Sequence, residues 1–110
     1  MSEIKEMSLA IREATTRYIN ITCKNAETGL DFDFDGYTVQ TYLSFGPRGQ
    51  YVESIIVGNM VSYKIPAVIS RGTRSGVAET RIFKNGDVFE VLRILIAVEK
   101  ANKPDTVPNN

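Results

Sequence analysis

The chain contains no histidine, and this absence excludes several common kinds of chemistry. Without an imidazole, neither a Ser-His-Asp nor a Cys-His catalytic set can form, and the usual general base near neutral pH is missing. Any catalysis would have to rest on carboxylate, lysine or tyrosine side chains or on Cys23, and no spacing of these residues along the chain indicates an active site. We therefore expect a protein that is not an enzyme, with no catalytic residues and no cofactor.

Cysteine occurs once, at Cys23, so the chain cannot form an internal disulfide and lacks the thiolates of a structural zinc site. This usage is typical of a reducing compartment. Long apolar segments are also lacking, because the longest run, residues 94–98, is far shorter than the roughly 20 residues that span a membrane. Residues 1–12 alternate charged and apolar side chains, unlike a secretion signal. These observations predict a soluble cytoplasmic protein.

An excess of charge of either sign is missing as well. Thirteen basic residues balance thirteen acidic residues, which gives a formal net charge of zero. This balance argues against a protein that is held to nucleic acid or to an anionic membrane by bulk electrostatic attraction. Copies of a neutral chain repel each other only weakly, so the composition favours self-association. We expect a homo-oligomer whose partner is another protein rather than a membrane or a nucleic acid.

What the chain does contain is regular hydrophobic patterning at both ends. Residues 2–20 carry apolar side chains at three- and four-residue spacing, which predicts a helix. Residues 87–100 show a similar stripe and are rich in helix-forming residues, which predicts a second helix. The dipeptide Asn85-Gly86 just before this segment is a strong hairpin signal, so a strand is the alternative there.

The middle of the chain has the pattern of an antiparallel meander. Runs of β-branched and aromatic residues, separated by glycine, proline and asparagine, mark five strands. They lie at residues 30–35, 37–45, 51–57, 60–65 and 77–83. The predicted fold class is therefore α+β, an antiparallel four- or five-stranded sheet with the N-terminal and the C-terminal helix packed on one face. Residues 1–101 form a single domain in this interpretation, and residues 102–110 form a flexible C-terminal tail.

The string Asp-Phe-Asp-Phe-Asp-Gly at residues 31–36 is the most site-like motif in the chain. Three alternating carboxylates followed by glycine also open the calcium loop of an EF-hand. That loop requires a glutamate at its twelfth position, where this chain has Tyr42, and it requires flanking helices where strands are predicted. Alternation along a solvated strand explains the carboxylates without a ligand. We therefore predict no metal site and keep Asp31, Asp33 and Asp35 only as a weak cation-binding candidate.

Two glycine-containing loops that carry arginine form the second candidate site. One loop contains Arg48, and the other contains Arg71 and Arg74. Guanidinium groups among flexible residues can hold phosphate or carboxylate groups, although neither loop matches a phosphate-binding signature. If the anion were a nucleotide, an aromatic side chain such as Tyr51 or Phe83 would stack on its base.

By exclusion, the leading hypothesis is a small non-enzymatic cytosolic binding protein that acts through contacts with another macromolecule. Inhibitors and accessory proteins of phages and mobile elements have this size, although no residue demonstrates such an origin. The first alternative is a small-ligand binding protein that holds a nucleotide or another phosphate-bearing anion in the arginine-containing loops. The second is a single-strand nucleic-acid binder that stacks bases on aromatic side chains of the sheet.

Overall fold

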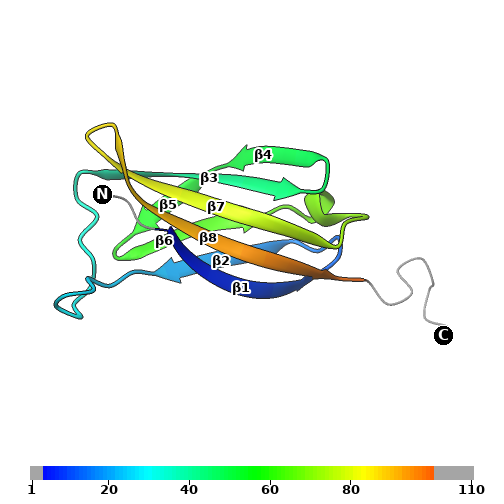
Figure 1. Ribbon diagram of the computed structural model, residues 1–110, viewed down its shortest axis with the longest axis horizontal. Helices are drawn as coiled ribbons and strands as arrows, with labels where there is room; N and C mark the ends of the chain where they lie inside the picture. The colour runs from blue at the N-terminus through cyan, green and yellow to red at the C-terminus, as the bar shows by residue number, and fades with distance from the viewer. Residues whose placement is uncertain (1–3, 101–110) are drawn as a thin grey trace.

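Eight strands and one short helix make up the regular structure of residues 4–100, the part of the chain that the computed structural model describes (Figure 1). The strands are β1 (Ile4–Arg12), β2 (Arg17–Thr22), β3 (Tyr37–Phe45), β4 (Arg48–Val52), β5 (Ser54–Val57), β6 (Met60–Ile65), β7 (Ser75–Lys84) and β8 (Asp87–Glu99). The helix is the single 3-10 turn η1 (Ala67–Ser70).

The strands form two sheets that pack face to face (Figure 1). The larger sheet has the spatial order β1-β8-β7-β3-β4, and the smaller sheet has the order β2-β6-β5. All paired strands run antiparallel except β1 and β8, which pair in parallel. The predicted α+β class is therefore wrong, because residues 4–100 form an all-β sandwich in which neither end of the described chain is a helix.

The helix predicted over residues 2–20 is replaced by β1, a turn and β2. Met7 and Ile11 are four residues apart, and this spacing places two side chains on one face of a helix and also on one face of a strand. The β-branched residues concentrated in 15–22 favour the strand, because they stiffen against a helical turn. Ile19 in β2 points into the core and is 7% exposed.

The predicted C-terminal helix is also wrong, and the strand alternative is correct. Asn85 and Gly86 form the turn between β7 and β8, with positive φ angles of 53° and 83° that suit a tight hairpin. Leu92, Ile94 and Ile96 alternate along β8 and point into the core. The apolar residues of 87–100 that would share one face of a helix lie on both faces of β8.

The strand predictions in the middle of the chain are largely confirmed. Residues 37–45 and 60–65 are β3 and β6, and residues 77–83 lie within β7. Residues 51–57 do not form one strand, because they divide between β4 and β5, which belong to different sheets. Residues 30–35 form a loop rather than a strand: Asp31 makes an isolated bridge with Lys24, and the N–H of Phe32 donates to the carbonyl of Cys23 at 3.1 Å. The predicted tail, residues 102–110, lies outside the described residues.

The core fills the space between the two sheets. Its centre is a cluster that includes Phe45 and Leu43 from β3 and Ile65 from β6, all fully buried. Two polar residues are buried in the same layer: the hydroxyls of Thr41 and Thr80 lie 2.8 Å apart and share a hydrogen bond between β3 and β7. Within residues 4–100 there is no helix of the length and apolar character that a membrane span requires.

Candidate functional site

The outward face of the five-stranded sheet carries the side chains that are best placed for recognition. Residues alternate between the two faces along each strand, so Thr41 and Leu43 of β3 point into the core while Gln40, Tyr42 and Ser44 point outward. No described strand of the second sheet packs on this outer face, because the smaller sheet lies on the inner side (Figure 1).

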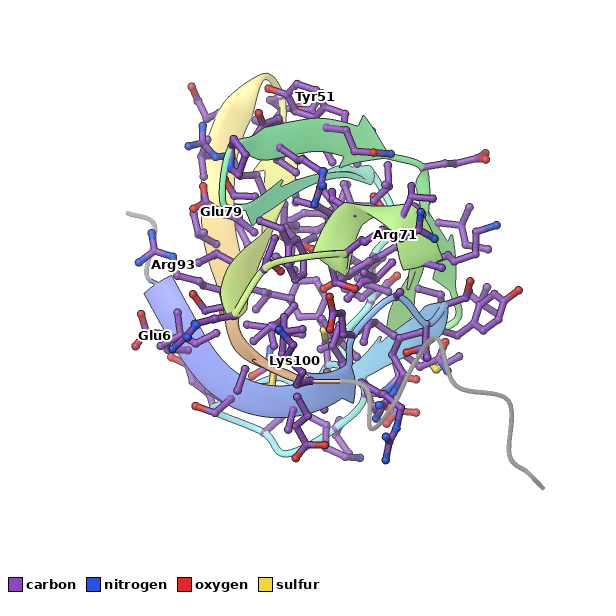
Figure 2. All side chains as sticks on the ribbon, turned by 90° about the vertical axis from the view of Figure 1, so that its right-hand side faces the viewer. Glu6, Tyr51, Arg71, Glu79, Arg93 and Lys100 are labelled. Carbon is purple, nitrogen blue, oxygen red and sulfur yellow. The ribbon has the colours of Figure 1, made fainter. Side chains whose placement is uncertain are left out.

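Strand register aligns five outward side chains in one row across the whole sheet, from β4 through β3, β7 and β8 to β1. We call this set the central row. Its members, in spatial order, are Tyr51, Tyr42, Glu79, Arg93 and Glu6. In the end-on view of Figure 2, Tyr51, Glu79, Arg93 and Glu6 follow one another down one side of the sandwich. Directly opposed side chains on neighbouring strands lie close enough to interact, so the row behaves as a connected unit.

The contacts along the central row divide it into an aromatic half and a charged half. The rings of Tyr42 and Tyr51 meet edge to face, with 4.7 Å between their centroids. In the charged half, Arg93 donates from Nη2 to Oε1 of Glu79 at 3.3 Å and from Nη1 to Oε2 of Glu6 at 3.5 Å. One end of the row therefore offers flat apolar rings, and the other end offers fixed charges.

Glu79 is the anchor of the charged half. Arg81, two residues further along β7, donates from Nε to Oε2 of Glu79 at 3.0 Å, so Arg81 and Arg93 each bond one oxygen of the carboxylate. Partial burial acts to raise the pKa of Glu79, but the hydrogen bonds from Arg81 and Arg93 outweigh it and hold the pKa below its usual value. Glu79 is therefore ionised near neutral pH and keeps both guanidinium groups in place.

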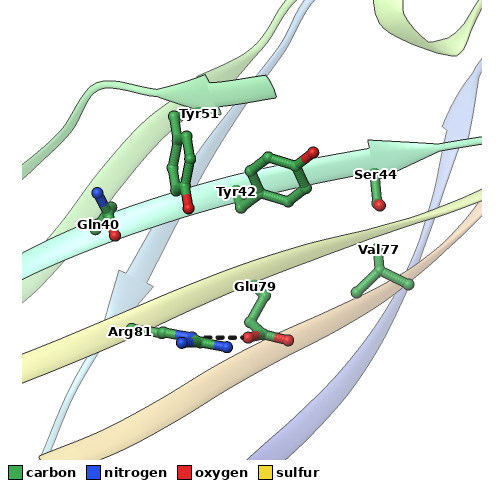
Figure 3. Close-up of a pocket in the computed structure, with 7 residues that line it drawn as sticks. All are labelled: Gln40, Tyr42, Ser44, Tyr51, Val77, Glu79 and Arg81. Atoms are coloured by element: carbon green, nitrogen blue, oxygen red, sulfur yellow. Dashed lines mark hydrogen bonds and ion pairs between the residues drawn. The ribbon is translucent and has the colours of Figure 1, made fainter. Parts of the chain in front are cut away.

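A shallow groove runs beside the aromatic half of the row (Figure 3). We call it the tyrosine groove. It is lined by Gln40, Tyr42, Ser44, Tyr51, Val77, Glu79 and Arg81 and has a volume of about 270 Å³. In Figure 3, Tyr51 reaches from β4 toward the side chains of β3, while Glu79 and Arg81 stand on the other side, on β7. Tyr51 is 64% exposed and Tyr42 is 39% exposed, so both rings are open to a partner.

Among the residues predicted from the sequence as ligand-binding, Arg48 and Arg71 are brought together. Arg48, the first residue of β4, donates from Nη1 to the carbonyl oxygens of Ile69 in η1 and of Arg71 just after it, which joins the start of β4 to this segment. Glu13 accepts a hydrogen bond at 2.6 Å from the N–H of Gly72. Two donors that could have held an anion are therefore already used within the chain. Nη1 of Arg48 is bonded to backbone carbonyls, and the N–H of Gly72 is bonded to the carboxylate of Glu13.

Arg74, Tyr51 and Phe83 lie at different places on the sandwich. Arg74 directly precedes β7 and Phe83 is near its far end, so about 30 Å separates them at roughly 3.3 Å per residue. Phe83 and Tyr51 both belong to the outward face, and only Tyr51 lines the tyrosine groove. One nucleotide that contacts both Arg74 and Phe83 would have to extend along almost the whole of β7.

The acidic motif at residues 31–36 lies at the end of the sandwich opposite to η1 and the arginine-containing loops (Figure 1). Its phenylalanines pack inward against Tyr37 and Phe89, with the Phe32 and Tyr37 rings 5.2 Å apart, while the three carboxylates are exposed. Asp31 pairs with Lys24 at 3.1 Å, and Asp33 accepts the backbone N–H of Asp35 at 2.9 Å. Within residues 4–100, no three acidic or cysteine side chains converge as a metal ion would require.

Cys23 lies beside these aromatic rings, in an apolar hollow of about 610 Å³ that includes Phe32, Phe89 and Leu92. Burial, and then the negative charge of Glu90, raise the pKa of the Cys23 thiol. A protonated, half-buried thiol is a weak nucleophile, so the surroundings of Cys23 do not suit covalent catalysis.

The sequence analysis selected Tyr51 as a ligand-binding candidate and Tyr42 only among the aromatics of the nucleic-acid alternative, and it did not identify Glu79 or Arg93 as candidate site residues. A signal was present, because polar and aromatic residues at every second position of β3 and β7 predict one exposed face. The alternation along single strands does not predict the register between strands, and the register places these side chains next to one another. No known protein-family model matches the chain, and no curated protein is significantly similar to it.

Proposed function

We propose that this protein is a binding protein whose partner is another protein, and that the tyrosine groove with the adjoining central row is the contact surface. The observation that carries the proposal is the exposed pair of Tyr42 and Tyr51 next to a guanidinium that Glu79 holds in position. Tyrosine and arginine are among the residue types most enriched at the energetic centres of protein interfaces. No step of this function requires catalysis.

The preorganisation of these side chains supports the proposal. A tyrosine ring has few rotatable bonds, and each ring of the pair is further restrained by the other, so little conformational entropy is lost on binding. Arg81 is bonded to Glu79 through Nε, yet its side chain is 54% exposed. Its terminal nitrogens, Nη1 and Nη2, can therefore still donate hydrogen bonds to a carboxylate of the partner. The matching partner surface presents an apolar side chain to the groove and an acidic side chain to Arg81.

The sheet face also fits a protein better than a polyanion. Glu6 and Glu79 are interleaved with the arginines of the face, so no continuous basic surface exists along the central row. Nucleic-acid binding depends on such a surface for most of its affinity. A reducing, cytoplasmic setting accords with this function, because Cys23 is the one cysteine of the chain.

The experiment that tests the proposal compares three forms of the protein. Each is first used to capture a partner and is then titrated, in purified form, against that partner. They are the wild type, the pair Tyr51→Ala and Arg81→Ala, and a control with Ile55→Ala and Lys64→Ala on the other sheet, where both residues are exposed. A partner captured by the wild type is purified, and its affinity is measured by titration calorimetry. We expect the groove pair to weaken binding by at least about 10-fold and the control to bind normally. Equal affinity for all three forms would reject the tyrosine groove as the interface.

A second candidate function, the binding of a phosphate-bearing anion, is favoured by the meeting of the two arginine-containing loops at Arg48 and Arg71. Titration of inorganic phosphate, followed by amide chemical shifts, tests it. Saturable shifts confined to the two loops, lost when Arg71 and Arg74 are both changed to alanine, would support this function in place of the first.

A further inference from the structure

β1 is an edge strand of the five-stranded sheet, and one of its sides has no strand beside it within residues 4–100. On its other side it pairs with β8 in continuous parallel register, from Ile4 opposite Val91 to Arg12 opposite Glu99. In Figure 1, β1 runs along the lower border of the large sheet, with β2 of the smaller sheet beside it. An edge of this length presents a row of backbone donors and acceptors that another strand can pair with.

The direction of the unpaired backbone groups follows from one hydrogen bond. The N–H of Glu13, just after β1, donates to the carbonyl of Glu99 at 2.8 Å. In a parallel ladder every second residue directs both its N–H and its C=O to the same neighbour. Odd-numbered residues of β1 therefore bond to β8, and even-numbered residues direct their N–H and C=O to the open side. These outward-bonding residues are Glu6, Ser8, Ala10 and Arg12. The carbonyl oxygen of Arg12 also accepts a hydrogen bond from Oγ1 of Thr15 at 2.6 Å, which leaves its second lone pair for a partner strand.

We propose that two copies of this chain pair β1 against β1 in antiparallel orientation, about a two-fold axis at Leu9. The two five-stranded sheets then become one continuous sheet. Ser8 of each copy lies opposite Ala10 of the other, and their outward N–H and C=O groups exchange hydrogen bonds. Glu6 lies opposite Arg12 of the second copy, and the two-fold axis repeats this pair at the other end of the contact.

Charge complementarity selects this register. With the axis at Leu9, each acidic side chain on the outer face of β1 meets a basic one, and the small residues Ser8 and Ala10 meet at the centre. Moving the axis to Ser8 would keep the same set of outward backbone groups but would place Glu6 opposite Ala10. Moving it to Ala10 would place Arg12 opposite Ser8. Opposite charges across a strand pair are favourable, so the two shifted registers each forfeit both ion pairs.

The inward side of the edge is also suited to a second copy. Met7 is 41% exposed, and with Leu9, Tyr18 and Ile94 it lines a groove of about 450 Å³ between the open edges of β1 and β2. In the proposed register β1 of the other copy runs alongside Met7 and covers part of this apolar surface, while Ile11, which lies opposite Met7, stays buried in its own core. The dimer leaves the tyrosine groove exposed on both copies, so this inference does not rest on the proposed function.

A charge-reversal series tests the pairing. The dimer dissociation constant is measured by sedimentation equilibrium for the wild type, for Arg12→Glu, for Arg12→Glu combined with Glu6→Arg, and for the control Lys64→Glu on the other sheet. We expect Arg12→Glu to weaken the dimer by about 10-fold, the double reversal to restore it, and the control to leave it unchanged. Glu6 loses its contact with Arg93 in the double variant, but an exposed pair of this kind contributes little to folding.

A backbone variant and a cross-linking pair give independent readouts. Ser8→Pro removes an outward N–H while sparing the bonds to β8, so the folded protein should become monomeric. In a Cys23→Ser background, Leu9→Cys should form an intermolecular disulfide under mild oxidation, because directly opposed residues that are not hydrogen-bonded to each other have Cα atoms roughly 4.5 Å apart. Ala10→Cys is the matched control, since its counterpart lies two residues away along the strand.

Circular dichroism shows which variants are folded. If Ser8→Pro does not fold, the charge-reversal series and the two cysteine variants test the pairing without it. The inference is overturned by a wild type that stays monomeric at all concentrations. It is also overturned if the dimer is unaffected by Arg12→Glu, or if Ala10→Cys cross-links as readily as Leu9→Cys.

Discussion

Arg93 and Glu79 stand directly opposite each other on β8 and β7, with 3.3 Å between Nη2 of the arginine and Oε1 of the glutamate. Arg93 also reaches Glu6 on β1, and the second oxygen of Glu79 accepts a bond from Arg81. Three adjacent strands are therefore linked on the outer face by one charged group of residues. This group adjoins Tyr42, which stands opposite Glu79 on β3.

Replacement of Glu79 by glutamine should change how stability depends on pH. The pKa of Glu79 in the folded protein lies below the unfolded value of about 4.3, so its stabilising effect is complete above that pH and is lost as the pH falls through the folded value. Because Arg81 and Arg93 are substantially exposed, we expect Glu79→Gln to cost only about 0.5 kcal/mol at pH 7. The difference from the wild type should shrink below about pH 4. Urea unfolding at several pH values measures it, with the exposed Glu53→Gln as control; a difference that grows in acid would contradict the expectation.

Two glycines offer a matched pair of substitutions that separates stability from binding. A Cβ at Gly76 would lie 2.3 Å from the ring of Phe45, which is fully buried, so Gly76→Ala should cost about 2 kcal/mol or more. A Cβ at Gly49 would lie 2.0 Å from the hydroxyl of Tyr42, at the end of an exposed side chain that can move. Gly49→Ala should therefore cost less than about 1 kcal/mol but displace Tyr42 and weaken partner binding. Thermal unfolding and calorimetric titration measure the two effects, and an equal loss of stability in both variants would show that Tyr42 is not free to move.

Tyr63 should make the protein sensitive to alkaline pH. Burial raises the pKa of Tyr63 to about 12, so the hydroxyl stays protonated in the folded state while an unfolded tyrosine ionises from about pH 10. The stabilising contribution is thus present below pH 10 and is lost as the pH rises toward about 12. Tyr63→Phe should unfold less readily than the wild type in this window.

Near neutral pH the same variant should differ little from the wild type. The Tyr63 hydroxyl is buried and has no hydrogen-bond partner among the described residues, and the nearby Thr80 hydroxyl is bonded to Thr41. Removing an unsatisfied hydroxyl should change stability by less than about 1 kcal/mol. Denaturant unfolding at pH 7 and above pH 10 checks both statements. A large destabilisation by Tyr63→Phe at pH 7 would mean that Thr80 and Tyr63 share a hydrogen bond.

The acidic motif should act as a structural loop that needs no cation. The Asp33 carboxylate holds the backbone N–H of Asp35, so Asp33→Ala should cost about 0.5–1 kcal/mol, and Asp33→Asn should cost less because its side-chain oxygen can still accept. Calcium should not change the melting temperature of the wild type. A calcium-dependent rise that disappears in Asp33→Asn would instead establish a cation site at Asp31, Asp33 and Asp35.

Local patterns in the sequence predicted much of the strand content and failed where one pattern fits two structures. Turn residues and β-branched runs correctly marked β3, β6 and β7, because these preferences act over a few residues. The N-terminal helix prediction failed because residues four apart, such as Met7 and Ile11, share a face in a helix and in a strand. The C-terminal one failed because its apolar residues lie on both faces of β8. At the C-terminal end, the hairpin signal of Asn85-Gly86 was the better guide, since the positive φ angles of that turn restrict the residues that can form it.

By itself the sequence determined what the protein lacks and which faces its strands expose. The missing histidine, the single cysteine and the balanced charge are facts of composition, and the alternation along β3 and β7 separates buried from exposed side chains before any fold is known. Only the tertiary structure decided which exposed residues meet. Tyr51, Glu79 and Glu6 lie far apart in the chain and share one row because hydrogen-bond register across five strands aligns them, and register depends on all the pairings of the sheet together.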